Sequence, residues 1–282
     1  MGSKQYWSMT EGVFNCLIDE QRTRAFEKGI KNTVQNGDVV VDMGTGSGIL
    51  AMFAVDAGAR KVYAIEWDRK NYEALRRSFA LNCYSDKIVL IKGDVTKIAL
   101  PEKVDVIVGE MISTGLIEEL QIPAMNNLLK YAKRSVRVVL KSMENYVDLV
   151  FNNDNFHGKI MKIVRYEYPG EKTLRSLPLS EKVLYRGVDF TKTNPNVLVD
   201  SKIGLAAVRG GVINGVRLCS RTIFHDGSTF DGSFAYCYPV ILPLDDMKVR
   251  KGQTLLLNVS YRMCEGFGTL KYSLLPLGAA SQ

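Results

Sequence analysis

The sequence is poor in histidine and has no closely paired cysteines. His157 and His225 are the only histidines among 282 residues, and they lie far apart in the chain. The five cysteines are scattered, and no two of them form a Cys-x-x-Cys pair. This pattern does not indicate a zinc site, a disulfide framework or a histidine-based catalytic triad. We therefore expect no metal and a reducing, cytoplasmic setting.

Long apolar runs are missing as well. No stretch of about 18 apolar residues occurs, so the sequence predicts no membrane span, and residues 1–5 lack the apolar core of a signal peptide. An apolar content of 46% is enough for a substantial core. The net charge of +7 favours an anionic partner such as RNA or a ribosomal surface, although each basic block taken singly is typical of a solvated helix face.

A glycine-rich turn is the most informative feature that is present. Residues 39–50 read VVVDMGTGSGIL, in which β-branched residues lead into Gly44, Gly46 and Gly48 and then into an apolar stretch. This order predicts a strand, a tight turn and a helix, the opening unit of a nucleotide-binding α/β sheet. Glycine allows a ligand to approach the backbone where a Cβ atom would collide with it.

Two acidic residues indicate which cofactor this turn binds. Glu66 ends the next predicted strand, where a carboxylate can accept both hydroxyls of a ribose. Asp42 precedes the glycines, and an acid there suits the positive amino group of S-adenosylmethionine (SAM) better than a pyrophosphate, which usually meets Gly-x-Gly-x-x-Gly. We predict a SAM site; the alternative is a turn that only packs a strand on a helix.

The periodicity predicts two kinds of architecture in succession. Residues 6–34 have helical spacing, and strands alternate with helices up to about residue 143, which favours a doubly wound parallel sheet. The predicted strands are 39–43, 62–66, 88–92, 104–108 and 137–141, and the helices cover 49–57, 71–82 and 123–131. We expect a helical segment at 1–35 that closes over the cofactor, a SAM-binding domain at 36–143 and a β-rich domain at 144–282.

The β-rich character rests on short apolar runs separated by turn signals. Asn214-Gly215, Asp226-Gly227 and Asp231-Gly232 are dipeptides typical of hairpins. These runs predict an antiparallel second domain.

Two glutamates follow the fourth predicted strand. Glu110 comes at its carboxyl end, which faces the ligand crevice in such sheets, and Glu119 comes nine residues later. On one helix that step would place them on opposite faces, so they converge only if the segment folds back as a loop. Ser113-Thr114-Gly115 supplies the turn chemistry. Converging carboxylates need a cation between them, such as a guanidinium; alternatively, Glu110 caps a helix and Glu119 faces solvent.

The stretch from residue 19 to residue 119 resembles the catalytic core of the protein arginine methyltransferases. The matching motifs are DEQRT at 19–23, DMGTGSGILAMFA at 42–54, AGARKV at 57–62 and the glutamates at 110 and 119. The resemblance implies a SAM-binding sheet followed by a barrel-like domain. It also implies roles for individual residues: Arg22 holds the SAM carboxylate, Gly44, Gly46 and Gly48 form the floor under the methionine part, Glu66 binds the ribose, Asp94 and Val95 lie near the adenine, and Glu110 and Glu119 hold the substrate guanidinium.

Several positions depart from the family's pattern. Where the family usually has Glu-Trp-Met-Gly-Tyr, residues 110–114 read EMIST, and its Thr-His-Trp loop has only residues 235–239, AYCYP, as the nearest segment. Cys16 stands where a methionine is expected, and the helical dimer arm is short or absent, since residues 188–191 run quickly into strand-like sequence. A homodimer is left open.

The sequence alone leaves three possible functions for this protein. The favoured one is methylation of arginine in a protein or peptide. The alternative is SAM-dependent N-methylation of RNA, a ribosomal protein amine or a small metabolite, although no Asp-Pro-Pro-Tyr-like motif follows the fourth strand. The third is a SAM-dependent binding or scaffold module that has lost catalysis; the presence of Glu110 and Glu119 weighs against it.

Overall fold

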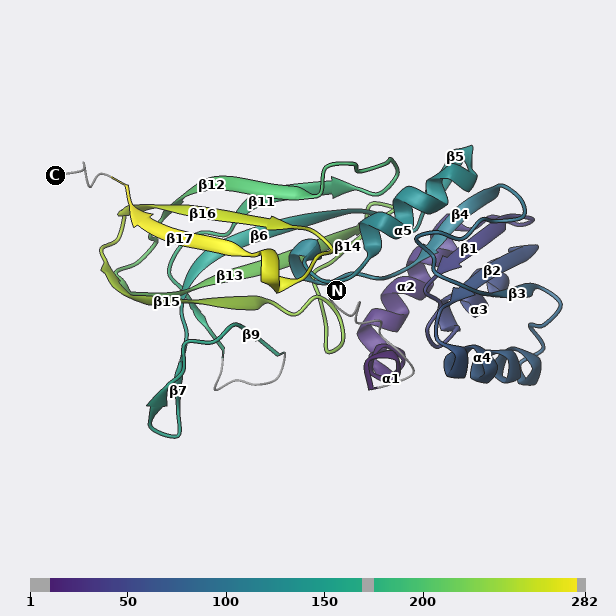
Figure 1. Ribbon diagram of the computed structural model, residues 1–282, viewed down its shortest axis with the longest axis horizontal. Coiled ribbons are helices and arrows are strands. Elements are labelled where there is room, and N and C mark those ends of the chain that lie inside the picture. The colour runs from purple at the N-terminus through teal and green to yellow at the C-terminus, as the bar shows by residue number, and fades with distance from the viewer. Residues whose placement is uncertain (1–10, 169–174, 278–282) are drawn as a thin grey trace.

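The computed structural model describes residues 11–168 and 175–277, and it has two parts that lie side by side (Figure 1). The amino-terminal part is a parallel sheet with helices, and the other part consists of antiparallel strands, which confirms the predicted fold class. None of the helices in the described residues is long and apolar enough to cross a membrane.

The parallel sheet has five strands in the order β3-β2-β1-β4-β5. Its strands are β1 (Val39–Met43), β2 (Lys61–Glu66), β3 (Ile88–Lys92), β4 (Val104–Gly109) and β5 (Ala132–Val138), and the connecting helices are α3 (Ile49–Asp56), α4 (Arg69–Leu81) and α5 (Gln121–Leu128). All residues of β1 are buried, as expected for a run of β-branched residues at the centre of such a sheet. The strand order reverses between β1 and β4, which places Met43 opposite Gly109 and brings the carboxyl ends of the two strands together.

The predicted helical segment at the amino terminus contains two helices. Helix α1 (Glu11–Ile18) ends before Asp19, and α2 (Glu20–Thr33) begins after it; residues 6–10 of the prediction lie outside the described residues. Asp19 has an extended backbone, and its Oδ1 accepts a hydrogen bond from the Arg22 N–H at 3.1 Å. A carboxylate in this position satisfies a free amide at the start of a helix, so α2 starts here.

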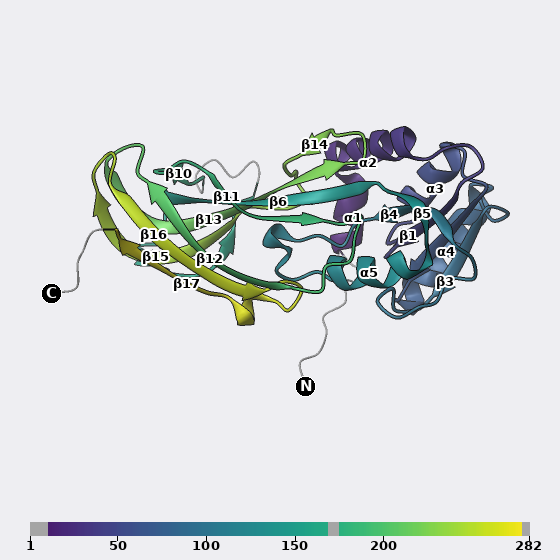
Figure 2. The same cartoon turned by 90° about the horizontal axis from the view of Figure 1, so that it is seen from above.

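Helices α1 and α2 lie at the junction of the two parts. Figure 2 shows α2 beside β14, and the ring of Phe26 on α2 packs edge-to-face on Phe224 at 5.4 Å. Gly29 faces the same ring, because a Cβ atom there would lie 2.5 Å from Phe224.

The second part contains two main sheets. One has seven strands, with the path β10-β6-β13-β15-β9 and with β11 and β14 added to β6 and β13; the other has the order β12-β16-β17. The strands are β6 (Leu140–Phe151), β7 (Asn155–Phe156), β8 (Lys159–Ile160), β9 (Arg165–Tyr166), β10 (Leu177–Pro178), β11 (Val183–Asp189), β12 (Leu198–Ala206), β13 (Gly211–Phe224), β14 (Thr229–Phe230), β15 (Val240–Val249), β16 (Thr254–Arg262) and β17 (Lys271–Pro276).

Two sequence predictions are wrong in this region. The predicted strand 137–141 is in fact the end of β5 and the start of β6, since the chain leaves the parallel sheet at Val139 and enters the antiparallel one. Asn214-Gly215 is not a hairpin turn but lies inside β13, where the ladder is irregular between Ile213 and Gly215. The Asn214 side chain there accepts from the Asn152 N–H at 2.7 Å, so its polar groups are satisfied by a neighbouring strand.

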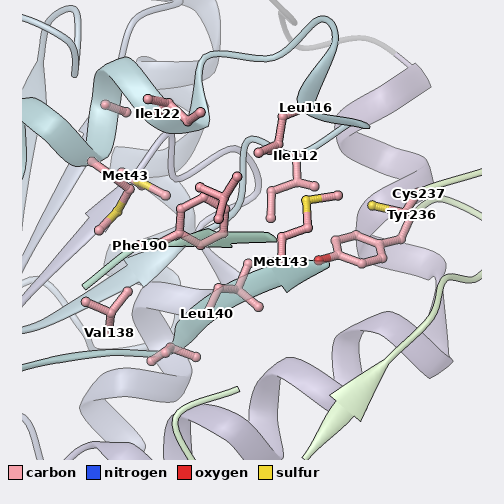
Figure 3. Close-up of a cluster of buried hydrophobic side chains, with 14 of the residues drawn as sticks. Met43, Ile112, Leu116, Ile122, Val138, Leu140, Met143, Phe190, Tyr236 and Cys237 are labelled. Carbon is pink, nitrogen blue, oxygen red and sulfur yellow. The ribbon is translucent and has the colours of Figure 1, made fainter. Parts of the chain in front are cut away.

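A shared core joins the two parts (Figure 3). Side chains from the parallel sheet, the loop after β4 and the antiparallel strands meet in it, each no more than 4% exposed: Met43, Ile112, Leu116, Met143 and Phe190. Burial of this kind contributes about 1.5–3 kcal/mol per large side chain. The loop after β4 is therefore packed between the parts rather than left free at the surface.

Candidate active site

The turn after β1 has the backbone that only glycine adopts readily. Gly44, Gly46 and Gly48 have φ angles of +60°, +56° and +81°. A Cβ atom on Gly48 would lie 2.7 Å from the side chains of Leu75 and Phe79, so this glycine serves the packing of α4. A Cβ atom on Gly46 would instead lie 3.7 Å from Val13 of α1. Helix α1 thus covers the turn.

Asp42 lies beneath this turn with one oxygen unused. It is fully buried, and its Oδ2 accepts from the Thr45 hydroxyl at 2.6 Å. Its Oδ1 has no hydrogen-bond partner among the described residues. Burial raises the pKa of Asp42 to about 7, against the effect of Thr45. An unpaired buried acceptor is costly, and it fits the positive amino group of a ligand such as SAM.

Glu66 ends β2 and is buried with its neighbours arranged around it. Its two oxygens accept from the Asp68 N–H at 2.8 Å and from the Asn71 side-chain amide at 2.7 Å. The same amide donates to the Gly46 carbonyl at 2.6 Å, so Asn71 ties the glycine turn to this carboxylate. Burial raises the pKa of Glu66, partly offset by these hydrogen bonds. Each oxygen keeps a second lone pair for a ligand hydroxyl.

Asp94 and Val95 follow β3 in a tightly held turn. The Asp94 carboxylate accepts from both the amide and the hydroxyl of Thr96, at 2.9 and 2.6 Å. Burial acts to raise the pKa of Asp94, but these hydrogen bonds outweigh it and the pKa is lowered. The Val95 carbonyl accepts from the Asn127 amide of α5 at 2.9 Å. Both residues are thus fixed, with Asp94 ionised, at the same edge of the sheet as Glu66.

The segment between Glu110 and Glu119 reverses direction as a loop, not as a continuing helix. The Ser113 hydroxyl accepts from the amides of Glu118 and Glu119, at 2.9 and 3.4 Å. Gly115 and Leu116 have φ angles of +69° and +55° within a short 3-10 turn. This geometry brings the second glutamate back toward the first.

Glu110 already has a cation. The Arg22 Nε and Nη2 atoms both donate to its Oε2, at 3.1 and 2.7 Å, and both side chains are only 7% exposed. The other oxygen accepts from the Ile112 N–H at 2.9 Å. Arg22 also donates to the carbonyl of Cys16 at 3.1 Å, so it links the end of α1 to residues 110–119, which we call the acid loop. The residue expected at the SAM carboxylate therefore contacts Glu110.

Glu119 has no such partner. Burial raises its pKa well above the ordinary value, and the charges of Glu110 and then Glu118 raise it further. It makes no ion pair with any residue in the described part of the chain. Arg22 is the ion-pair partner of Glu110, so the second of the two interacting carboxylates has no cation paired with it among the described residues.

The antiparallel part closes the site from the other side, through contacts that sequence reasoning missed. The Asp19 Oδ2 atom accepts from the Ser233 hydroxyl at 2.5 Å and from the Ala235 N–H at 2.6 Å. Cys237 follows in the same segment with a φ angle of +49°, and burial together with Glu110 and Glu119 raises its pKa well above the ordinary value. The sequence pattern indicated no helix start at Asp19, because residues 6–34 have helical spacing throughout. The turn predicted at Ser113-Thr114-Gly115 was the signal for Ser113, whereas nothing local indicated the role of Asn71.

Comparison with known proteins places these features in context. Residues 22–140 match a family model described as ribosomal protein L11 methyltransferase (PrmA). The uncharacterised protein MJ1452 of Methanocaldococcus jannaschii is 32% identical over 263 residues, which cover 93% of this chain and 95% of that protein. A histone-arginine methyltransferase of Anopheles gambiae is 38% identical over 117 residues, which cover 41% of this chain and only 19% of that protein. A probable histone-arginine methyltransferase of Arabidopsis thaliana is 43% identical over 108 residues, 37% of this chain and 20% of that protein.

Solved structures share the fold along nearly the whole chain. A Trypanosoma brucei PRMT1 enzyme–prozyme complex with S-adenosylhomocysteine has a TM-score of 0.79 at 19% identity, covering 94% of this chain and 93% of that chain. Protein arginine methyltransferase 10 of Arabidopsis thaliana has a TM-score of 0.76 at 16% identity, covering 93% and 95%. The likeness extends through both parts of the molecule.

Proposed function

Because the chain belongs to the same family as the Methanocaldococcus jannaschii protein and is a divergent, arginine-methyltransferase-like enzyme that uses SAM as its cofactor, we propose that its acceptor is an arginine guanidinium held by Glu110 and Glu119. The observation that supports this proposal most directly is that Glu119 has no cation paired with it among the described residues. Arg22 balances Glu110, whereas Glu119 has a raised pKa and no ion pair among the described residues. A guanidinium offers one positive charge and a planar fork of donors that matches two carboxylates.

The cofactor site follows from the same geometry. Asp42 Oδ1 would accept from the amino group of SAM, the glycine turn would lie under its methionine part, and Glu66 would accept from the ribose hydroxyls. Arg22 would contact the carboxylate of SAM while it remains near Glu110. Asp94 and Val95 would border the adenine. When bound, SAM supplies an electrophilic methyl group.

The protein's own contribution to the reaction is position and charge. Glu110 and Glu119 would hold the guanidinium by some of its N–H groups and leave one terminal nitrogen free toward the cofactor. Fixed carboxylates stabilise the positive charge of the acceptor as it is redistributed. Glu119, the carboxylate without an ion pair among the described residues, would accept the proton that the nitrogen releases.

The Glu119→Gln variant tests this proposal. We expect turnover to fall by about 100-fold or more, because a neutral amide cannot balance the guanidinium, while SAM affinity stays within about twofold because Asp42 and Glu66 are untouched. Glu73→Gln on the exposed face of α4 is the control. Methyl transfer from labelled SAM to arginine peptides and SAM binding by calorimetry are the measurements. Undiminished turnover in Glu119→Gln would contradict the proposal.

A protein amine is the second candidate acceptor, favoured by the match of residues 22–140 to the ribosomal protein L11 methyltransferase model. Mass spectrometry of the labelled product separates the two. Methylarginine supports the carboxylate clamp, and methyllysine or a methylated amino terminus supports the amine. An amine nucleophile must lose its charge before it attacks, so two carboxylates beside it would act against the reaction.

A further inference from the structure

We propose that three tyrosines, Tyr166, Tyr168 and Tyr238, form with Glu118 a subsite for a second cationic side chain of the acceptor. We call Tyr166, Tyr168 and Tyr238 the tyrosine cluster. The enzyme would then prefer peptides in which a lysine or arginine lies close to the target arginine. This inference rests on the proposed function and adds the chemistry by which the substrate is chosen.

The rings form one compact group. The centroid of Tyr238 lies 4.8 Å from that of Tyr168 and 5.7 Å from that of Tyr166, and Tyr166 and Tyr168 are 6.2 Å apart. None of these pairs is stacked face to face; the interplanar angles are 66°, 59° and 57°. Tyr168 remains 50% exposed, so part of its ring is available to a ligand. Aromatic faces attract ammonium and guanidinium groups.

The tyrosine cluster is attached directly to the acid loop. The Tyr166 hydroxyl donates to Glu118 Oε2 at 2.5 Å, and the Thr114 hydroxyl donates to the Tyr238 carbonyl at 2.5 Å. The backbone holds the rings in register, since Tyr166 pairs with Val240 and the Glu167 N–H donates to the Pro239 carbonyl at 2.8 Å. After burial, Glu118 is the main cause that raises the pKa of Tyr166, and Glu119 also contributes. The tyrosine cluster therefore lies at the Glu119 end of the loop.

Charge favours a cation as the occupant. Glu118 is exposed, and it makes no ion pair with any residue that the structure describes. Its carboxylate lies at the edge of the aromatic group and next in sequence to the glutamate proposed to hold the target guanidinium. An aromatic surface with an unpaired carboxylate at its rim matches a flexible cationic side chain better than an apolar or an acidic one.

Two peptides of equal length test the subsite. Each has one arginine; one peptide has a lysine two residues from it, and the other has glutamine in that place. We expect the wild-type enzyme to show a KM about tenfold lower for the lysine peptide, with similar kcat. Tyr168→Leu and Glu118→Gln should each bring the ratio of the two KM values toward about one with kcat little changed.

The controls remove equivalent groups elsewhere. Phe151→Leu removes an exposed ring from β6, and Glu144→Gln alters a carboxylate that also accepts from a tyrosine hydroxyl, that of Tyr146 at 2.5 Å. Both should keep the wild-type ratio, and unchanged SAM affinity shows that each variant is folded. Equal KM values for the two peptides in the wild type, or a ratio that survives both subsite variants, would overturn the subsite alone. No transfer to either peptide would overturn the proposed function with it.

Discussion

In the proposed cofactor site, Asp42 would link stability, pH and cofactor binding. Its pKa is raised from about 3.8 to about 7 in the folded protein because the carboxylate is buried. A carboxyl group whose pKa is higher in the folded than in the unfolded protein stabilises the folded state at pH values below about 3.8. This stabilisation is lost as the pH rises toward 7. Under the proposed binding mode the cofactor would have the opposite requirement, since its amino group would need the ionised form of Asp42.

Asp42→Asn should therefore remove a pH dependence. Without cofactor, we expect the unfolding free energy of the wild type to fall, relative to that of the variant, by about 2–4 kcal/mol between pH 4 and pH 7. SAM affinity of the wild type should weaken as the pH falls below about 7, and the variant should bind weakly at every pH. Urea unfolding and calorimetry across this range measure both effects. Parallel pH profiles for the two proteins would contradict the assignment.

At the level of elements, the break between α1 and α2 connects the two parts of the molecule. Asp19 caps α2 through one oxygen and holds the 233–235 segment through the other. Asp68 caps α4 in the same way, with its Oδ1 accepting from the Asn71 N–H at 2.8 Å. The two aspartates thus share one local role, and among the described residues Asp19 also has partners distant in the sequence.

Asp19→Ala should destabilise the protein more than Asp68→Ala does. Loss of a cap costs about 1 kcal/mol, which we expect for Asp68→Ala. Asp19→Ala also leaves the donors of Ser233 and Ala235 without their acceptor, at about 1–3 kcal/mol more. Chemical denaturation of both variants measures the difference. Equal losses would show that the contact between Asp19 and the 233–235 segment contributes little.

At the level of the whole molecule, the antiparallel part holds the acid loop in shape. The Ser220 hydroxyl accepts from the Gly115 N–H at 2.9 Å, and the Tyr261 hydroxyl donates to the Gly115 carbonyl at 2.7 Å. The Cys264 amide donates to the carbonyl of Leu116 at 2.7 Å. The loop that carries both glutamates is thus fixed by strands from the other end of the chain.

Tyr261→Phe should lower kcat by about tenfold while SAM affinity changes little, because the loop loses one hydrogen bond of its support and the cofactor site does not. Tyr272→Phe is the matched control, since its hydroxyl donates to the Pro243 carbonyl at 2.9 Å, outside this loop. Steady-state kinetics and calorimetry give the two quantities. A fall in SAM affinity as large as the fall in kcat would count against a separate role for the loop.

The parallel sheet and its glycine turn could be predicted from the sequence. β1 and β3 have the predicted bounds, because a buried strand and a glycine with positive φ depend on residues that are neighbours in the chain. The sequence also predicted a β-rich second part from its short runs and turns. Its errors arose where pairing with distant strands decides the outcome: at 137–141 the chain passes from one sheet to the other, and at Asn214-Gly215 a strand continues.

The assembly of the site depends on contacts between distant parts of the chain, which the sequence does not reveal. The pairing of Arg22 with Glu110 joins residues 88 positions apart, and the contact of Tyr261 with Gly115 joins residues 146 positions apart. Neither leaves a periodic trace in the sequence, because the spacing of side chains along a chain is unrelated to the contacts made when distant elements pack together. The charge balance around Glu119 depends on those contacts, so it becomes visible only in the folded molecule.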